Sequence, residues 1–283
     1  MERESCLSML MVLLGCLAML ACGWWPPAHA RATSARSLER IAWRALWLPV
    51  VPALVVVAAL GGWALGQPDP IPDKVSLWLV VLSLPCAALA LRAGLRASRA
   101  LICAQGESST ATVGLVRPWI VFSPHLARRL SERQLQAALE HERAHVRHRD
   151  PLRIWLAQLA TDLQWPWPSA RRRLGDWLVA LEAARDEEAR AAGVEGSDLA
   201  EVIVACARLA GAGDHRQAAL SGEASSLKQR VQRLLLPLPA WSVTPGFRRW
   251  TAAMALAGLL IAAAILGALF GQPVLHELFA LTA

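Results

Sequence analysis

The sequence predicts a mainly α-helical membrane protein with four transmembrane helices and a helical cytoplasmic domain that carries a small β-hairpin. Of its 283 residues, 55% are hydrophobic and only 18% are charged, which is less charge than a water-soluble domain of this length usually carries. Its 29 basic residues exceed its 22 acidic ones, and the arginines flank the apolar runs. This composition excludes a disordered chain, and six scattered cysteines exclude a disulfide scaffold.

Four apolar runs are long enough to cross a bilayer core, which takes about 20 helical residues. They are residues 6–25, 45–66, 75–91 and 252–270. Pro49 and Pro52 predict a kink near the start of the second run. A cleaved signal peptide is the alternative for the first run, although Glu2-Arg3-Glu4 carries the wrong net charge for one.

The orientation of these helices follows from the basic residues in the short loops. Residues 31–44 and 92–99 are rich in arginine, whereas the loop 67–74 is acidic. We therefore expect a multi-pass protein of a bacterial-type inner membrane, with both termini outside. Four segments follow from this topology: the first helix with its flanks, a linker with the second and third helices, a cytoplasmic domain, and the fourth helix with a short extracytoplasmic tail. Their residues are 1–30, 31–96, 97–250 and 251–283, respectively.

The cytoplasmic segment begins with two β-prone runs, 111–116 and 119–122, that predict a hairpin. Ser131 and Gln134 form a capping box, which predicts a helix from there to about His148. Asp150 is the expected cap of the next helix. Further helices are expected at 169–192, 198–209 and 225–235.

The string His141-Glu142-Arg143-Ala144-His145 lies inside the first of these helices and is an HExxH motif. Residues four apart project from one helix face, so the two imidazoles can hold one zinc ion. Glu142 is then the expected general base. A pattern with three fixed positions also arises by chance, and the alternative is a charged, solvated helix face.

A catalytic zinc site needs a third protein ligand, and Glu182 is our candidate. Asp186 lies four residues later on the same face, where it can accept the other ring N–H of a zinc-bound histidine. The alternative for Glu182 is an ion pair with a nearby arginine on its own helix. Glu187 and Glu188 point elsewhere and are interpreted as solvated, and His148 as a surface histidine.

After the HExxH motif come His148-Arg149-Asp150-Pro151, then a Trp/Pro break, and then Glu-x-x-x-Asp. Together with the preceding segment 117–124, these features resemble the BlaR/MecR antirepressor membrane metallopeptidases, a gluzincin-like family. The resemblance covers about 45–270 and is densest over 117–189. It implies a zincin-like peptidase domain with one zinc per chain, held by His141, His145 and Glu182, and with Glu142 as the base.

The resemblance also implies a function: a membrane-embedded zinc endopeptidase that cleaves a cytoplasmic protein, such as a transcriptional repressor in a regulatory or antibiotic-response pathway. The sensory members carry a large extracellular penicillin-binding domain, whereas only residues 271–283 follow the last span here, so we expect no direct sensing of β-lactams. Two alternatives stay open. One is a quality-control protease of the HtpX and Ste24 types, and the other is a non-enzymatic membrane scaffold.

The expected partners are the protein substrate and membrane lipids, with oligomerisation left open. The arginines at 171–173 and 248–249 are interpreted as facing anionic headgroups. The sequence has no helix-turn-helix, zinc finger or interleaved aromatic and basic strand, so direct nucleic-acid binding is not expected.

Overall fold

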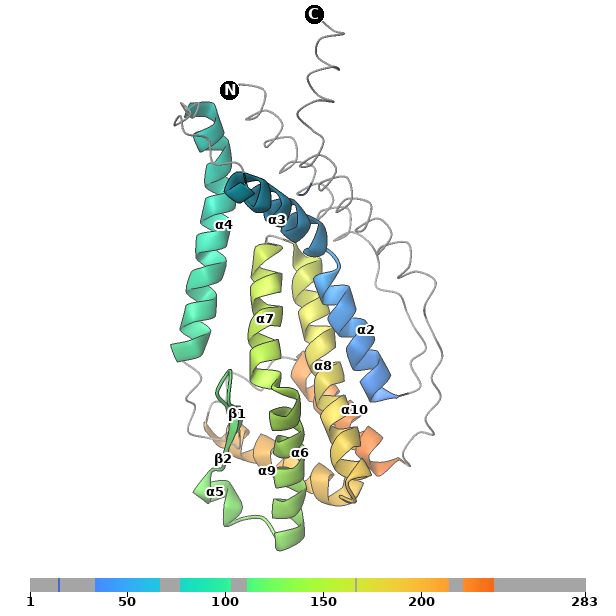
Figure 1. Cartoon of the computed structure of the whole chain (residues 1–283). Helices are drawn as coiled ribbons and strands as arrows, with labels where there is room; N and C mark the ends of the chain where they lie inside the picture. Colours follow the sequence, from blue (N-terminus) through green and yellow to red (C-terminus); the bar gives the residue numbers. More distant parts are fainter. Residues whose placement is uncertain are drawn as a thin grey trace, which may run out of the picture.

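The computed structural model describes residues 34–66, 77–102, 111–165, 167–213 and 221–236, together with residue 15. This part of the chain is mainly helical, as predicted, and holds one small antiparallel sheet (Figure 1). In chain order the elements are α2 (Ala35–Trp47), α3 (Val51–Gly66), α4 (Leu77–Ile102), β1 (Ala111–Val113), β2 (Trp119–Val121), α5 (Pro124–Ala127), α6 (Glu132–His148), α7 (Asp150–Leu163), α8 (Pro168–Ala191), α9 (Gly196–Gly213) and α10 (Ser221–Leu235).

The helices α2, α7 and α8 form one bundle, with α4 running beside α7 (Figure 1). Its core is built around Trp177, which is fully buried and lies 4.9 Å from the ring of Trp43. Ala157 and Ala160 present only small side chains on the buried face of α7, which lets the tryptophan pack closely against that helix. Burying an aromatic side chain of this kind contributes about 3 kcal/mol to folding.

The helix α6 packs against α8 and α9, and α10 packs against α9 (Figure 1). The predicted capping box is present: the Ser131 hydroxyl accepts from the amide of Gln134, and the Gln134 side chain accepts from the amide of Ser131 at 2.8 Å. A second apolar cluster joins these helices, made of Ala137, Ala189, Leu199, Ala200, Ile203 and Leu234. This cluster fixes α6 relative to α8, the two helices that carry the predicted metal ligands.

The predicted hairpin is present, with strands shorter than expected. Thr112 pairs with Ile120 in an antiparallel register, and the sheet contacts α6. Gly114 ends β1 with φ +99°, where a Cβ would lie only 2.6 Å from the Trp119 ring and 2.8 Å from the Arg117 carbonyl. A side chain at this position is therefore excluded both by the backbone and by space.

The connection from α6 to α7 is a single residue in a left-handed conformation, Arg149, with φ 51° and ψ 45°. The prediction that Asp150 caps α7 is wrong, because Arg149 occupies the cap position and makes no side-chain capping bond. Asp150 is instead the first helical residue, and its carboxylate is completely buried. The sharp turn leaves this carboxylate beside the end of α6.

The second predicted span is broken as Pro49 and Pro52 suggested, since α2 ends at Trp47 and α3 begins at Val51. Among the described residues, no single helix meets the length and hydropathy expected of a span. One bent pair, Ala35–Trp47 with Val51–Ala58 at 50°, meets them together. The expected third span falls largely on α4, whereas the fourth, and the first apart from residue 15, lie outside the described residues. The four-helix topology therefore stays a prediction.

Candidate metal centre

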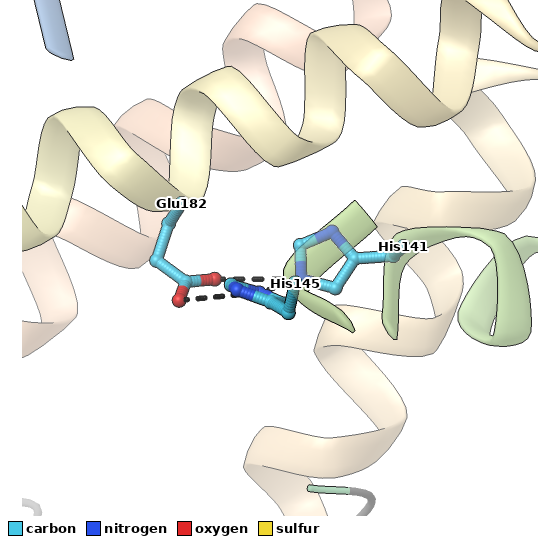
Figure 2. A group of neighbouring side chains, drawn as sticks. All are labelled: His141, His145 and Glu182. Atoms are coloured by element: carbon cyan, nitrogen blue, oxygen red, sulfur yellow. Dashed lines mark hydrogen bonds and ion pairs between the residues drawn. The ribbon is translucent and has the colours of Figure 1, made fainter. Parts of the chain in front are cut away.

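The helices α6 and α8 bring the three predicted ligands together. His141 and His145 lie on one buried face of α6, and Glu182 on α8 points at both rings (Figure 2). Their Nε2 atoms are 3.1 Å apart, and the Glu182 carboxylate oxygens lie 3.5 Å from the Nε2 of His141 and 3.7 Å from that of His145. Zinc ligands at 2.0–2.1 Å in a tetrahedral arrangement lie about 3.3 Å from one another. This donor set therefore fits a single zinc ion.

Asp186 lies where the sequence predicted it, behind one of the rings. Its Oδ1 is 3.0 Å from Nδ1 of His141, on the side of the ring away from Glu182. Burial alone would lower the pKa of His141, but the carboxylates of Asp186 and Glu182 outweigh it and raise that pKa to about 9. A carboxylate behind Nδ1 directs Nε2 toward the predicted metal position.

The equivalent partner of His145 is Asp150, whose Oδ2 lies 2.8 Å from the Nδ1 atom. Arg185 of α8 donates to the same carboxylate at 2.8 Å, and Arg153 donates at 3.1 Å. Burial would raise the pKa of Asp150, but hydrogen bonds from Arg185 and His145 lower it to about 2. The sequence reasoning missed this role. The available signal was an aspartate five residues after the second histidine.

Glu142, the predicted base, is half-buried and is held from the hairpin. The Thr112 hydroxyl on β1 donates to its Oε2 at 2.7 Å. The register of β1 on β2 places this hydroxyl over the middle of α6. Nothing in the local sequence indicates this contact, because it depends on how the hairpin packs.

Arg230 of α10 is a further charged group that belongs to this site. Its guanidinium donates to both carboxylate oxygens of Asp186 at 2.6 and 2.7 Å, and its Nη1 lies 2.9 Å from Oε2 of Glu182. Its Nη2 is 3.4 Å from Nε2 of His141. The sequence predicted neither this residue nor the pairing, since the arginine comes from a distant helix rather than from α8. Burial would raise the pKa of Glu182, but His141 and Arg230 lower it well below its usual range.

Two predictions about the following residues are wrong. Glu188 is not solvated: only 13% of its side chain is exposed, and it accepts from Arg147 and His148 at 2.8 Å each. Glu187 accepts from the backbone amide of Ala35 at 2.7 Å, which ties the start of α2 to α8. His148 lies at the surface as expected, and it is Glu182 rather than His148 that lies close to the two histidines.

The model of the BlaR1 peptidase family, peptidase M56, matches residues 91–234. The chain belongs to this family. The match covers half of the chain and includes the whole of the site, from Thr112 to Arg230. It confirms the resemblance to the BlaR/MecR proteins and indicates a peptidase. No curated protein and no solved structure matches the chain.

Proposed function

We propose that this chain is a zinc-dependent endopeptidase of the BlaR1 type that cleaves a cytoplasmic protein. The observation that carries the proposal is the convergence of two imidazole Nε2 atoms and one carboxylate within 3.1–3.7 Å of one another, next to Glu142 in the same motif. Membership of a peptidase family and a donor set that fits zinc support the same reaction.

His141, His145 and Glu182 would hold the metal, which when bound would polarise the scissile carbonyl and make water a better nucleophile. His145 would donate its Nδ1–H to Asp150, and the carboxylate of Asp186 lies 3.0 Å from Nδ1 of His141, so the Nε2 atom of each ring faces the metal position. The two carboxylates thereby fix the orientation of the rings before any metal arrives.

Glu142 would take the proton from the attacking water and pass it to the amine that leaves. The hydroxyl of Thr112 holds one of its two oxygens, so the other remains available for the proton. Arg230 keeps Glu182 and Asp186 in place from the opposite side.

The hairpin is the proposed substrate guide. Among the described residues the sheet has two strands, so each strand has one edge that no other described strand occupies, and the side chains of Trp119 and Val121 are 57% and 44% exposed. An extended peptide that adds to an edge of this sheet would pass the side of α6 that carries Glu142. We propose a transcriptional repressor as the substrate, cleaved at the inner face of a bacterial-type membrane by the domain 97–250.

Glu142→Gln tests the proposal in the full chain, co-expressed with a candidate repressor as substrate. We expect cleavage to be lost while one zinc per chain is retained, because glutamine keeps the shape but cannot accept the proton. Glu140→Gln, on the same helix and paired with Arg143 and Arg147, is the matched control and should cleave normally. Cleavage by Glu142→Gln at the wild-type rate would contradict the proposal.

A further inference from the structure

A polar cavity lies far from the metal ligands, between α4, the end of α7 and the start of α8. Its volume is about 400 Å³, and its charged and aromatic walls are Arg92, Arg96, Asp162, Trp165, Trp167 and Arg171. Figure 1 places the α7–α8 turn at the end of the bundle next to α3. The 14 residues of α7 separate it from Asp150 by about 20 Å.

The charge of this cavity favours an anion. Three guanidinium groups face a single carboxylate, Asp162, and Arg96 lies 3.2 Å from that carboxylate. Gln158 also donates to Asp162 at 3.1 Å. Asp162 is thus already occupied, and among the described residues that line the cavity no other carboxylate balances the positive charges of Arg92 and Arg171.

Arg92 is held in position without an acceptor for one of its donors. Its guanidinium lies over the ring of Trp165, with Cζ 5.1 Å from the centroid. Its Nη1 atom is buried, and no hydrogen-bond acceptor lies within reach of it in the part of the chain that the structure describes. Arg92 also lines the cavity, and the planar fork of arginine matches the oxygens of a phosphate.

The surroundings point to the source of that phosphate. Immediately before Arg92, α4 exposes large apolar side chains, with Leu84 at 56% and Leu91 at 65%. Trp165, at the rim, is 51% exposed. Tryptophan and arginine next to an exposed apolar surface are typical of the headgroup level of a membrane.

We propose that this cavity binds the phosphate of an anionic lipid headgroup, held by Arg92 and Arg171 and bordered by Trp165. The volume exceeds that of a bare phosphate and leaves space for the attached headgroup. Binding would join α4, α7 and α8 at the membrane end of the bundle, while the candidate metal centre stays at the other end of α7. The site does not depend on peptidase activity.

The test uses the full chain in micelles of a zwitterionic lipid and follows its melting temperature as phosphatidylglycerol is added. The cavity variant is Arg92→Gln with Arg171→Gln. The control variant, Arg129→Gln with Arg133→Gln, removes the same charge from two exposed arginines outside the cavity. We expect the wild type and the control to be stabilised, and the cavity variant to need roughly tenfold more lipid.

An equal loss of lipid stabilisation in the cavity and control variants would reveal unspecific attraction and overturn the proposal. Lipid stabilisation that is unchanged in both variants would overturn it as well. Inorganic phosphate is the second arm: stabilisation equal to that by the lipid at the same phosphate concentration would make free phosphate the ligand and overturn the lipid assignment. Since the cavity variant risks misfolding, Arg171→Gln alone serves as a second variant, because Arg171 is exposed. A photoactivatable phosphatidylglycerol should also crosslink the wild type at Arg92 or Trp165, and crosslinks elsewhere only would overturn the proposal.

Discussion

Asp150 lies 2.8 Å from Nδ1 of His145, although the two residues belong to different helices. The left-handed conformation of Arg149 between α6 and α7 produces this contact, because it turns the start of α7 back toward the last turn of α6. Arg185 of α8 holds the same carboxylate. A residue that follows the HExxH motif thus links three helices to one predicted metal ligand.

The first prediction is that Asp150→Asn weakens zinc binding by roughly 10- to 100-fold, the usual effect of losing a carboxylate behind a ligating histidine. The variant also removes the nearest counter-charge of the buried Arg185, which keeps only Glu188 at 3.7 Å, so we expect the free energy of unfolding to fall by about 3 kcal/mol. Chelator competition and chemical denaturation measure the two effects. Asp176→Asn, at an exposed position of α8, should change neither. Unchanged zinc affinity in Asp150→Asn would refute the role.

The second prediction concerns Arg230, which bridges Asp186 and Glu182. Arg230→Lys keeps the positive charge but loses the planar fork, so it cannot hold both carboxylates at once. We expect about tenfold weaker zinc binding. The control is Arg233→Lys, an exposed residue one turn along α10. If both variants bind zinc as the wild type does, Arg230 does not position the ligands.

The third prediction is that Thr112→Val slows peptide cleavage without loss of zinc. Valine has the same shape but removes the 2.7 Å hydrogen bond to Glu142. A bond of this kind contributes about 1–1.5 kcal/mol, which corresponds to a rate about five- to tenfold lower. Steady-state cleavage and zinc content are measured on the same sample. Ser98→Ala, which removes another hydroxyl on the distant α4, should cleave at the wild-type rate. A wild-type rate in Thr112→Val would show that the hairpin does not assist the base.

The fourth prediction is that zinc uptake releases a proton from His141. In the metal-free chain the pKa of this residue is raised from 6.5 to about 9, so it is charged at neutral pH and must lose its proton before it binds metal. Zinc affinity should therefore rise with pH up to about 9. Because the pKa is raised on folding, the stabilisation that the charged ring gives the metal-free protein is complete below pH 6.5 and is lost as the pH rises through about 9.

Calorimetry of zinc binding in buffers of different ionisation enthalpy counts these protons. We expect about one proton released from His141 at neutral pH, and fewer in Asp186→Asn, because Asp186 is a main cause of the raised pKa. Binding without proton release would contradict the charged state assigned to His141.

The sequence predicted those site residues whose relation to one another is fixed by spacing within a single helix. The capping box at Ser131 set the start of α6, and helical spacing set His141 and His145 on one face, as it did Glu182 and Asp186. That the two pairs would meet was predicted from the need of a catalytic zinc for a third ligand and from the family resemblance, because no local rule fixes how α6 packs on α8.

The missed residues depend on tertiary contacts. Thr112 reaches Glu142 through the packing of the hairpin, and Arg230 arrives from a helix nearly 50 residues after Glu182. Glu188 was wrongly expected in solvent because its surroundings, Arg147 and His148 on α6, are not visible from the sequence of α8. The α2 helix could not be expected to pack along α8 either, since its residues read as a short linker before a span.

The account depends most directly on the identity of the metal ligands, which zinc-edge X-ray absorption of the purified full chain measures. We predict one zinc per chain with nitrogen and oxygen neighbours at about 2.0–2.1 Å, two of them imidazoles. In Glu182→Ala we expect one oxygen neighbour to be lost. Absence of zinc, sulfur neighbours at about 2.3 Å, or an unchanged spectrum in Glu182→Ala would contradict the proposed centre.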